Sequence, residues 1–416
     1  MNMPYTTAAM RRADFWIQRM PANIADTVYD RQKINAYLLQ SPHLIDMAQP
    51  APPPPPPRSW TAPWPSGYTD QGQPVFPSTF YPVQSNAVLR PAPFPYGVAV
   101  TRAALRSWPT SLAVFRQAGD FDFDQLQQTR IHHWEFVWIL GESQDQEWYL
   151  VQSSIYRGWV RQEEIAGMDG TLADRVKQLL TGDSLVVGQP GVMTEPAPLA
   201  RDFAPHPLDW AALIPYRTDP PKQWDHQSAQ DHVMIYWPIR QKDGSLSIQQ
   251  RWVNDGPGLH RSYYPTTRRH LLQQAFTLLG QRYGWGDSFD RHDCSSFIMD
   301  SYRQIGVFLP RNSRAQAEAG TPKILLSGDR AARMQQLSVQ ALPGDLLFMP
   351  GHIMIYLGQW QERPYVLHAF VGYREQKDSA DTVWMNQVAV FPLDLWMRNV
   401  PQTYLETVTR LTRILV

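Results

Sequence analysis

The sequence has few of the features that mark disulfide-rich, nucleic-acid-binding or membrane-spanning proteins. It contains one cysteine, which excludes an intramolecular disulfide and any metal site built from several cysteines. Its 38 basic and 38 acidic residues give no net charge, and hence no general attraction for nucleic acid. No run of about 18 apolar residues is present, so no membrane-spanning helix is predicted. The single cysteine, Cys294, is either a small core residue or a nucleophile.

The first 20 residues also lack the pattern of a secretory signal. Arg11 and Arg12 are not followed by the apolar stretch that such a signal requires. Two compartments stay open on this ground. The protein is cytoplasmic, or it belongs to the cell envelope or periplasm and a signal has been removed.

The chain is rich in proline and tryptophan, with 37 and 16 residues. Its 416 residues, 43% of them hydrophobic, are enough for several folded domains. Residues 1–97 are expected to form a stabilising segment, with two short helices between Ala8 and Ile45 and a proline-rich arm. The run from Pro50 to Pro57 predicts extended polyproline II, either as a rigid spacer or as a ligand for a proline-recognising module.

Two β domains are predicted next, over residues 98–166 and 167–262. In the first, Phe136–Leu140 and Trp148–Gln152 have the composition of short strands and flank a polar turn. In the second, Met234–Ile239 and Leu246–Val253 flank an Asp243-Gly244 turn, which is typical of hairpins. We expect short strands and no long helix in either domain.

Residues 263–416 have the pattern of an α+β domain, with helices first and an antiparallel sheet after them. A helix is expected to end at Gly280, which suits the position after a helix end. A second helix is expected to begin near Asp293. The expected elements are helices at His270–Leu279, from Asp293 to Gly306 and at Leu393–Asn399, and strands at Leu346–Met349, His352–Leu357, Tyr365–Phe370 and Val388–Phe391.

Cys294 follows Asp293, a residue type that caps helix N-termini. A cysteine in the first helical turn is exposed to the helix dipole and to free amides, which favour a thiolate and could bind an oxyanion. His352 and His368 fall on two strands that a hairpin around Gln359–Arg363 would bring together on one face. These three side chains have the order of a nucleophile, a base and a group that orients the base.

Each of these residues also has a structural interpretation. A lone cysteine on a helix is commonly a small buried hydrophobe, and strand histidines are commonly hydrogen-bonded core residues. His292 is a competing base, but it lies two residues before Cys294, and such positions point apart at a helix start. The combination of Cys294 with His352 and His368 favours catalysis over the structural interpretations.

Residues 266–400 resemble the NlpC family of papain-like cell-wall cysteine peptidases. The upstream chain resembles the subfamily that has an N-terminal stabilising segment and two bacterial SH3-like barrels, with Tyr156-Arg157-Gly158-Trp159-Val160 matching a barrel strand. The motifs in the C-terminal part are Ala275-Phe276, Leu279-Gly280, Tyr283-Gly284-Trp285-Gly286, Asp293-Cys294-Ser295-Ser296-Phe297, Leu309-Pro310-Arg311 with Ser313 and Gln316, Pro343-Gly344-Asp345-Leu346, Gly351-His352-Ile353 and Tyr356-Leu357-Gly358.

The resemblance implies a peptidase that cleaves the amide between the γ-carboxyl of D-glutamate and a diamino acid in peptidoglycan stem peptides, with a requirement for a free N-terminal L-alanine. Cys294 would be the nucleophile, His352 the general base and acid, and His368 the orienting residue. Tyr283 would lie beside the oxyanion, while Asp293, Ser295 and Tyr156 would bind the substrate amine. One acidic residue of the first barrel would assist, for which the sequence offers Asp122, Asp124 and Glu135.

The sequence departs from the family pattern at Asp287, where a glycine often completes the loop, and in a longer His352–His368 spacing. The mechanism needs no metal or cofactor, and the expected partners are murein fragments rather than nucleic acid. We expect a monomer. The alternative function is a non-catalytic cell-wall-binding protein with SH3-like modules.

Overall fold

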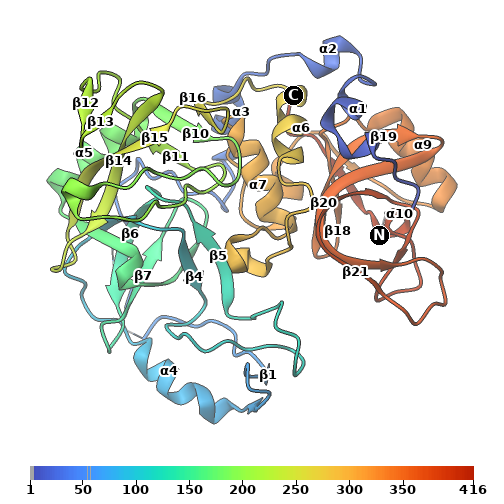
Figure 1. The fold of residues 1–416 in the computed structure, drawn as a ribbon. Coiled ribbons are helices and arrows are strands. Elements are labelled where there is room, and N and C mark those ends of the chain that lie inside the picture. Colours follow the sequence, from blue (N-terminus) through green and yellow to red (C-terminus); the bar gives the residue numbers. More distant parts are fainter. Residues whose placement is uncertain (1–3, 54, 57) are drawn as a thin grey trace. The chain divides into compact units, whose positions relative to one another are not determined.

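The computed structural model describes residues 4–53, 55–56 and 58–416, and these form two compact units (Figure 1). One unit, here called the cysteine unit, comprises Met1–Leu44, Tyr263–Gly284 and Arg291–Val416. The other, here called the barrel unit, comprises Ile45–Ser262 and Trp285–Asp290. Two prolines of the predicted spacer, Pro54 and Pro57, lie outside the described residues.

The first β region of the barrel unit is a seven-stranded antiparallel sheet. Alternate residues of its central strands face two cores, with Trp138 and Trp148 on one side and Val137 and Tyr149 on the other. The two strands predicted here are confirmed. In sheet order the strands are β5 (Gln127–Ile131), β4 (Ala103–Arg106), β8 (Arg157–Arg161), β7 (Trp148–Gln152), β6 (Phe136–Glu142), β3 (Tyr96–Ala99) and β9 (Ile165–Met168), with the short helix η3 (Gln162–Glu164) before β9.

The second β region contains a hairpin, a small sheet and one helix that the sequence analysis missed. Helix α5 (Gly170–Thr181) is capped by Asp169, whose side chain accepts from the Leu172 amide, and buries Ala173 and Val176. The expectation of strands without a long helix was therefore wrong here. The remaining elements are the sheet β11 (Leu213–Pro215), β10 (Ser184–Val187) and β16 (Leu259–Arg261), the hairpin β14 (His232–Arg240) and β15 (Leu246–Asn254), the pair β12 (Gln223–Trp224) and β13 (Gln227–Ser228), and η4 (Pro198–Ala200).

Both β regions contribute to one hydrophobic core. Trp138 and Trp159 from the first region and Trp237 and Val253 from the second belong to the same buried cluster. The proline-rich arm packs on it, because Trp60 donates from Nε1 to the Ser107 carbonyl at 2.8 Å and Trp64 lies 5.2 Å from Trp108. The arm carries β1 (Gly67–Tyr68), β2 (Pro74–Val75), η2 (Pro77–Phe80) and α4 (Tyr81–Asn86).

The cysteine unit combines a mixed set of helices with an antiparallel sheet, as predicted. Figure 1 shows α6 and α7 side by side, in yellow. The helices are α6 (Arg268–Phe276), α7 (Cys294–Gln304), α8 (Ser313–Ala319), α9 (Arg330–Gln340) and α10 (Tyr404–Thr407). The strands, in sheet order, are β17 (Lys323–Leu325), β23 (Arg410–Thr412), β18 (Leu346–Met349), β19 (His352–Trp360), β20 (Arg363–Arg374) and β21 (Val383–Pro392), with β22 (Trp396–Met397) paired to β20.

The closing helix predicted at Leu393–Asn399 was wrong. Leu393 and Asp394 form a turn after β21, and the Leu395 amide donates to the Pro392 carbonyl at 3.5 Å. This segment leads into the short strand β22. The last helix is α10, which begins after Thr403 with a capping box formed with Glu406.

Residues 4–44 pack within the cysteine unit. Trp16 is buried, and its ring centre lies 5.2 Å from that of Tyr365. The ring centres of Phe15 and Trp360 are 5.3 Å apart. Two helices were expected here, and the segment has four short ones because Pro21 and other breaks divide it. They are η1 (Ala9–Arg11), α1 (Ala13–Ile17), α2 (Ala22–Ala25) and α3 (Arg31–Leu38). Among the described residues, no helix is both long enough and apolar enough to cross a membrane.

A buried ion network fixes the ends of the cysteine unit. Asp345, fully buried at the start of β18, pairs with Arg268 at 3.0 Å and with Arg413 at 2.8 Å. Arg268 also donates to the carbonyls of Pro343 and Leu415, at 2.7 and 3.2 Å. The Pro-Gly-Asp motif therefore joins the first helix of the domain to the last strand.

Replacement of Asp345 by asparagine is expected to destabilise the protein by about 3–5 kcal/mol, because it leaves the buried Arg268 without a counter-charge. The free energy of unfolding in urea measures this effect. Asp378→Asn, at an exposed position, is the matched control and is expected to change stability by less than about 0.5 kcal/mol. Equal stabilities for the two variants would contradict the role given to the network.

Candidate functional site

Cys294 is the first residue of helix α7, and Asp293 is its N-cap as predicted. The Asp293 side chain accepts hydrogen bonds from the amides of Ser295 and Ser296, both at 2.9 Å. The Ser296 hydroxyl accepts from the Asp293 amide at 3.0 Å, which completes a capping box. The cap fixes the backbone on which the thiol is carried.

This cap changes one expectation about the oxyanion. The sequence predicted that free amides of the first turn would bind it. Two of them, from Ser295 and Ser296, already donate to the Asp293 carboxylate. These two amides are therefore engaged, and the prediction was wrong for them.

Arg311 pairs with Asp293 inside the protein. Its guanidinium donates to the two carboxylate oxygens at 2.7 and 3.2 Å and to the Ser295 hydroxyl at 2.8 Å. The side chains of both partners are nearly inaccessible. Burial acts to raise the pKa of Asp293, but the charge and hydrogen bonds of Arg311 outweigh it and hold that pKa below its usual value.

His352 and His368 meet as the sequence predicted. They lie on the antiparallel strands β19 and β20, and Nε2 of His352 is 2.8 Å from Nδ1 of His368. His368 is fully buried and stacks on Phe370 with ring centres 4.1 Å apart. The rings of Phe391 and Tyr404 also pack around His368. Within the described part of the chain, Nε2 of His368 has no hydrogen-bond partner.

The Cys294 thiol lies against the first residues of β19. The amide of Ile353, the residue after His352, donates a hydrogen bond to the thiol that acts to lower its pKa. Burial and the neighbouring Asp293 charge outweigh this bond and raise the pKa of Cys294 to about 12. Burial also lowers the pKa of His352 to about 4, although part of that side chain stays accessible.

The pKa of His368 lies well below its usual value, chiefly through burial and next through the charge that His352 would carry. All three shifts favour uncharged side chains. Burial thus favours the thiol form of Cys294 and the neutral forms of both imidazoles. A thiolate–imidazolium pair would have to form during the reaction.

His292, the competing base, has a structural role. Its Nδ1 is 2.7 Å from the Gln281 amide oxygen and its Nε2 is 3.1 Å from the Asp300 carboxylate. Its carbonyl accepts from the Gly284 amide at 2.9 Å, and Tyr283 bridges to it. These contacts hold Tyr283 beside the chain that leads into Cys294.

Tyr156 belongs to the barrel unit. It precedes β8, and its hydroxyl donates to the Gln128 side-chain oxygen at 2.7 Å. Among the three acidic candidates, Asp124 is buried, pairs with Arg106 at 2.8 Å and accepts from the Val114 and Leu126 amides. Glu135 accepts from the Ser154 hydroxyl at 3.2 Å, so these contacts do not single out one of the three.

Two residues of the site were given no role from the sequence. Arg311 neutralises Asp293, and Gln316 donates to the carbonyls of Ser295 and Pro310, both at 2.8 Å. Both lie in the quoted Leu-Pro-Arg motif region. A buried arginine or glutamine cannot be distinguished there from an exposed one without the fold.

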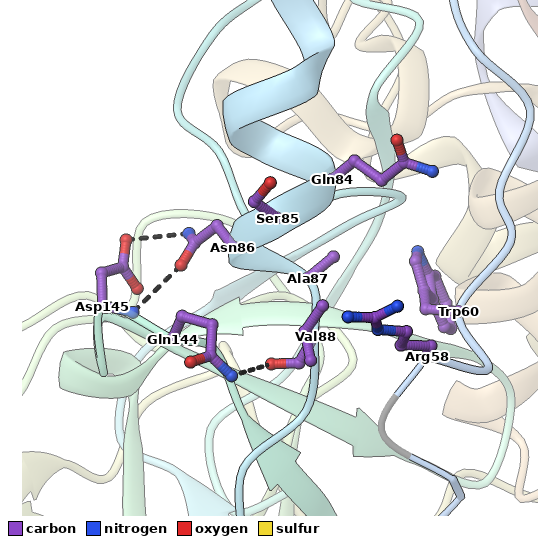
Figure 2. Close-up of a pocket in the computed structure, with 9 residues that line it drawn as sticks. All are labelled: Arg58, Trp60, Gln84, Ser85, Asn86, Ala87, Val88, Gln144 and Asp145. Carbon is purple, nitrogen blue, oxygen red and sulfur yellow. Dashed lines mark hydrogen bonds between the residues drawn. The ribbon is translucent and has the colours of Figure 1, made fainter.

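A pocket of about 920 Å³ lies elsewhere, on the barrel unit (Figure 2). Asn86 and Asp145 form one wall through a reciprocal pair of hydrogen bonds, at 2.8 and 3.0 Å. Arg58 and Trp60 of the proline-rich arm line it on another side. It contains none of the predicted site residues.

Comparisons with known proteins agree with this architecture. Residues 280–388 match the NlpC/P60 family, and residues 113–161 match the SH3 domain of SH3b1 type. A probable endopeptidase of Corynebacterium glutamicum is 37% identical over 71 residues, which are 17% of this chain and 34% of that protein. Dipeptidyl-peptidase 6 of Lysinibacillus sphaericus is 28% identical over 129 residues, which are 31% of this chain and 42% of that protein. The chain thus spans less than half the length of these relatives.

Two solved structures have a similar fold, one over the whole chain and the other over 77% of it. An NlpC/P60 endopeptidase from Photobacterium damselae subsp. piscicida has a TM-score of 0.78 at 17% identity, covering 100% of this chain and 98% of that one. An NlpC/P60 family protein from Bacillus cereus has a TM-score of 0.53 at 16% identity, covering 77% and 100%. These findings confirm the fold class predicted from the sequence. The chain therefore carries an SH3 domain of the SH3b1 type followed by an NlpC/P60 domain that contains Cys294, His352 and His368.

Proposed function

We propose that the protein is a cysteine endopeptidase acting on peptidoglycan stem peptides, at the amide between the D-glutamate γ-carboxyl and a diamino acid. The observation that carries the proposal is the arrangement in the cysteine unit. A capped helix places Cys294 against the start of β19, where His352 is hydrogen-bonded to His368 at 2.8 Å. The names of the relatives support peptidase chemistry.

The hydrogen bond between the two histidines determines which ring nitrogen of each one carries a proton. If His352 accepts the thiol proton, it does so through Nδ1, because Nε2 faces His368. Nε2 of His352 must then donate to Nδ1 of His368, which places the His368 proton on its Nε2 among the aromatic rings. His368 thus acts as a neutral acceptor that holds the ring of His352 in position.

The reaction then follows in two stages. His352 removes the Cys294 proton, the thiolate attacks the γ-carbonyl carbon, and the carbonyl electrons move to oxygen. When the intermediate collapses, His352 gives its proton to the leaving amine of the diamino acid. Water attacks the thioester with His352 as base, which releases L-Ala–D-Glu with a free γ-carboxylate and restores the thiol. Because the Ser295 and Ser296 amides cap the helix, we assign the oxyanion to the Cys294 amide and the Tyr283 hydroxyl.

Recognition of a free N-terminal L-alanine is assigned to Asp293, Ser295 and Tyr156, with Asp122, Asp124 or Glu135 from the barrel. The Asp293 charge is already balanced by Arg311. An ammonium group bound to Asp293 alone would therefore meet little net negative charge. A second carboxylate from the barrel supplies it, and this gives the SH3-like domain a part in substrate choice.

Cys294→Ala is expected to abolish release of L-Ala–D-Glu from a synthetic L-Ala–γ-D-Glu–diamino acid peptide, because no other described residue of the site supplies the nucleophile. Mass spectrometry of the products tests the bond and the reaction together. The same peptide with an acetylated N-terminus is the control and is expected to resist cleavage. Unchanged turnover by the alanine variant would contradict the peptidase and favour the non-catalytic wall-binding alternative.

Tyr156→Phe is expected to raise KM for the free-amine peptide by about tenfold or more, since one hydrogen bond to a charged group contributes about 1.5–3 kcal/mol. The value of kcat is expected to change little. Tyr81→Phe, at an exposed site of the barrel unit, provides the comparison. An unaltered KM in the Tyr156 variant would remove the barrel from substrate binding.

The pH dependence follows from the two shifted groups. With a pKa of about 4, His352 is neutral and able to accept a proton above that pH, so the acid limb of kcat/KM is expected near pH 4. With a pKa of about 12, the Cys294 thiol is deprotonated to a growing extent as the pH rises. Its alkylation by iodoacetamide is therefore expected to accelerate from about pH 6 to about pH 9 without levelling off. A plateau in alkylation below neutral pH would instead show a resting ion pair.

A further inference from the structure

The segment Trp285–Asp290, which forms η5, packs with the barrel unit, although Gly284 before it and Arg291 after it belong to the cysteine unit. Its backbone is unusual. Gly286 has φ of 55°, and Asp287, Phe289 and Asp290 have φ of 64°, 61° and 55°. Non-glycine residues in the left-handed region are strained, and such conformations persist where surrounding contacts hold them.

The contacts that hold this segment come from strand β5. Asp287 is buried, and its Oδ2 accepts from the Thr129 hydroxyl at 2.9 Å and from the Arg130 amide at 3.1 Å. The Gln127 side-chain amide donates to the Gly286 carbonyl at 2.8 Å. At the exposed edge, Asp290 pairs with Arg130 at 3.1 Å.

The approach between the two backbones is close enough to require glycine at one position. A Cβ atom on Gly286 would lie 2.7 Å from the Gln127 carbonyl oxygen, closer than packed atoms allow. The adjacent Asp287 then fills the space that a glycine would leave empty. It supplies the acceptor that a glycine lacks, so the departure from the family pattern has a structural purpose.

Although Asp287 anchors the middle of the Trp285–Asp290 segment, the segment exposes two large aromatic side chains. Trp285 is 38% and Phe289 is 53% exposed. Trp285 packs edge-on against Phe123 of the barrel at 5.7 Å. The segment begins two residues after Tyr283 and ends four residues before Cys294. Its conformation therefore bears on both ends of the chain that carries the reacting groups.

We propose that Asp287 is a positioning residue, through which strand β5 of the barrel fixes the Trp285–Asp290 segment and so sets the backbone of Tyr283 and Cys294 for the reaction. This inference rests on the proposed peptidase function. A glycine at position 287 could not replace the aspartate, because it lacks the side-chain oxygen that accepts these hydrogen bonds.

Three variants test this assignment. Asp287→Ala removes both acceptor contacts and is expected to lower kcat/KM on the order of tenfold or more, mainly through kcat, since small displacements of reacting groups are costly. Asp287→Asn keeps an acceptor oxygen for Thr129 and Arg130 and is expected to retain most of the activity. Asp290→Ala removes the exposed ion pair and is the matched control, with kcat within about twofold of the parent protein.

Two measurements separate this inference from the proposed function, because neither needs a substrate. Cleavage of the folded protein by a protease that cuts after aromatic residues is expected to occur at Trp285 or Phe289 faster in Asp287→Ala than in Asp287→Asn. The alkylation rate of Cys294 is expected to change in the alanine variant alone. An inactive parent protein that shows these differences would refute the peptidase and keep the positioning role. Equal kcat, protease sensitivity and alkylation for Asp287→Ala and Asp290→Ala would overturn the positioning role.

Discussion

The buried pair of Asp293 and Arg311 is the interaction on which the site depends. A carboxylate at a helix start is favoured by the dipole, yet in a water-free interior it is unfavourable unless a counter-charge is present. Arg311 supplies that charge at 2.7 Å, and the same carboxylate then orders two amides and a hydroxyl around the first turn. The backbone that carries Cys294 is thereby fixed by one ion pair and its hydrogen bonds.

Burial away from water has a second effect, which acts on the side chains that would react. The low dielectric that strengthens the ion pair also penalises new charge on Cys294, His352 and His368. A histidine as third residue adds no negative charge, so it orients its neighbour without stabilising an imidazolium as a carboxylate would. The site is thus organised in shape while it stays electrically neutral at rest.

The local features of this site were readable from the sequence, and the long-range ones were not. The cap at Asp293 and the strands of His352 and His368 depend on neighbouring residue types and on spacing, which a sequence displays directly. The partner of Asp293 lies 18 residues away, and the packing of Asp287 on Thr129 spans 158 residues. Such pairings follow from tertiary packing. Helix α5 was missed for a related reason, because its amphipathic pattern lies between strands.

The division of the chain also constrains the order in which it can fold during synthesis. Phe15 and Trp16 pack on Trp360 of β19 and Tyr365 of β20, which the ribosome adds more than 300 residues later. The barrel unit, apart from the short Trp285–Asp290 segment, is complete by Ser262 and can form while the rest is still being made. The N-terminal segment must therefore remain unpacked, with Phe15 and Trp16 exposed, until strands β19 and β20 have been synthesised. Until then, these two aromatic side chains are a site at which a chaperone could protect the nascent chain.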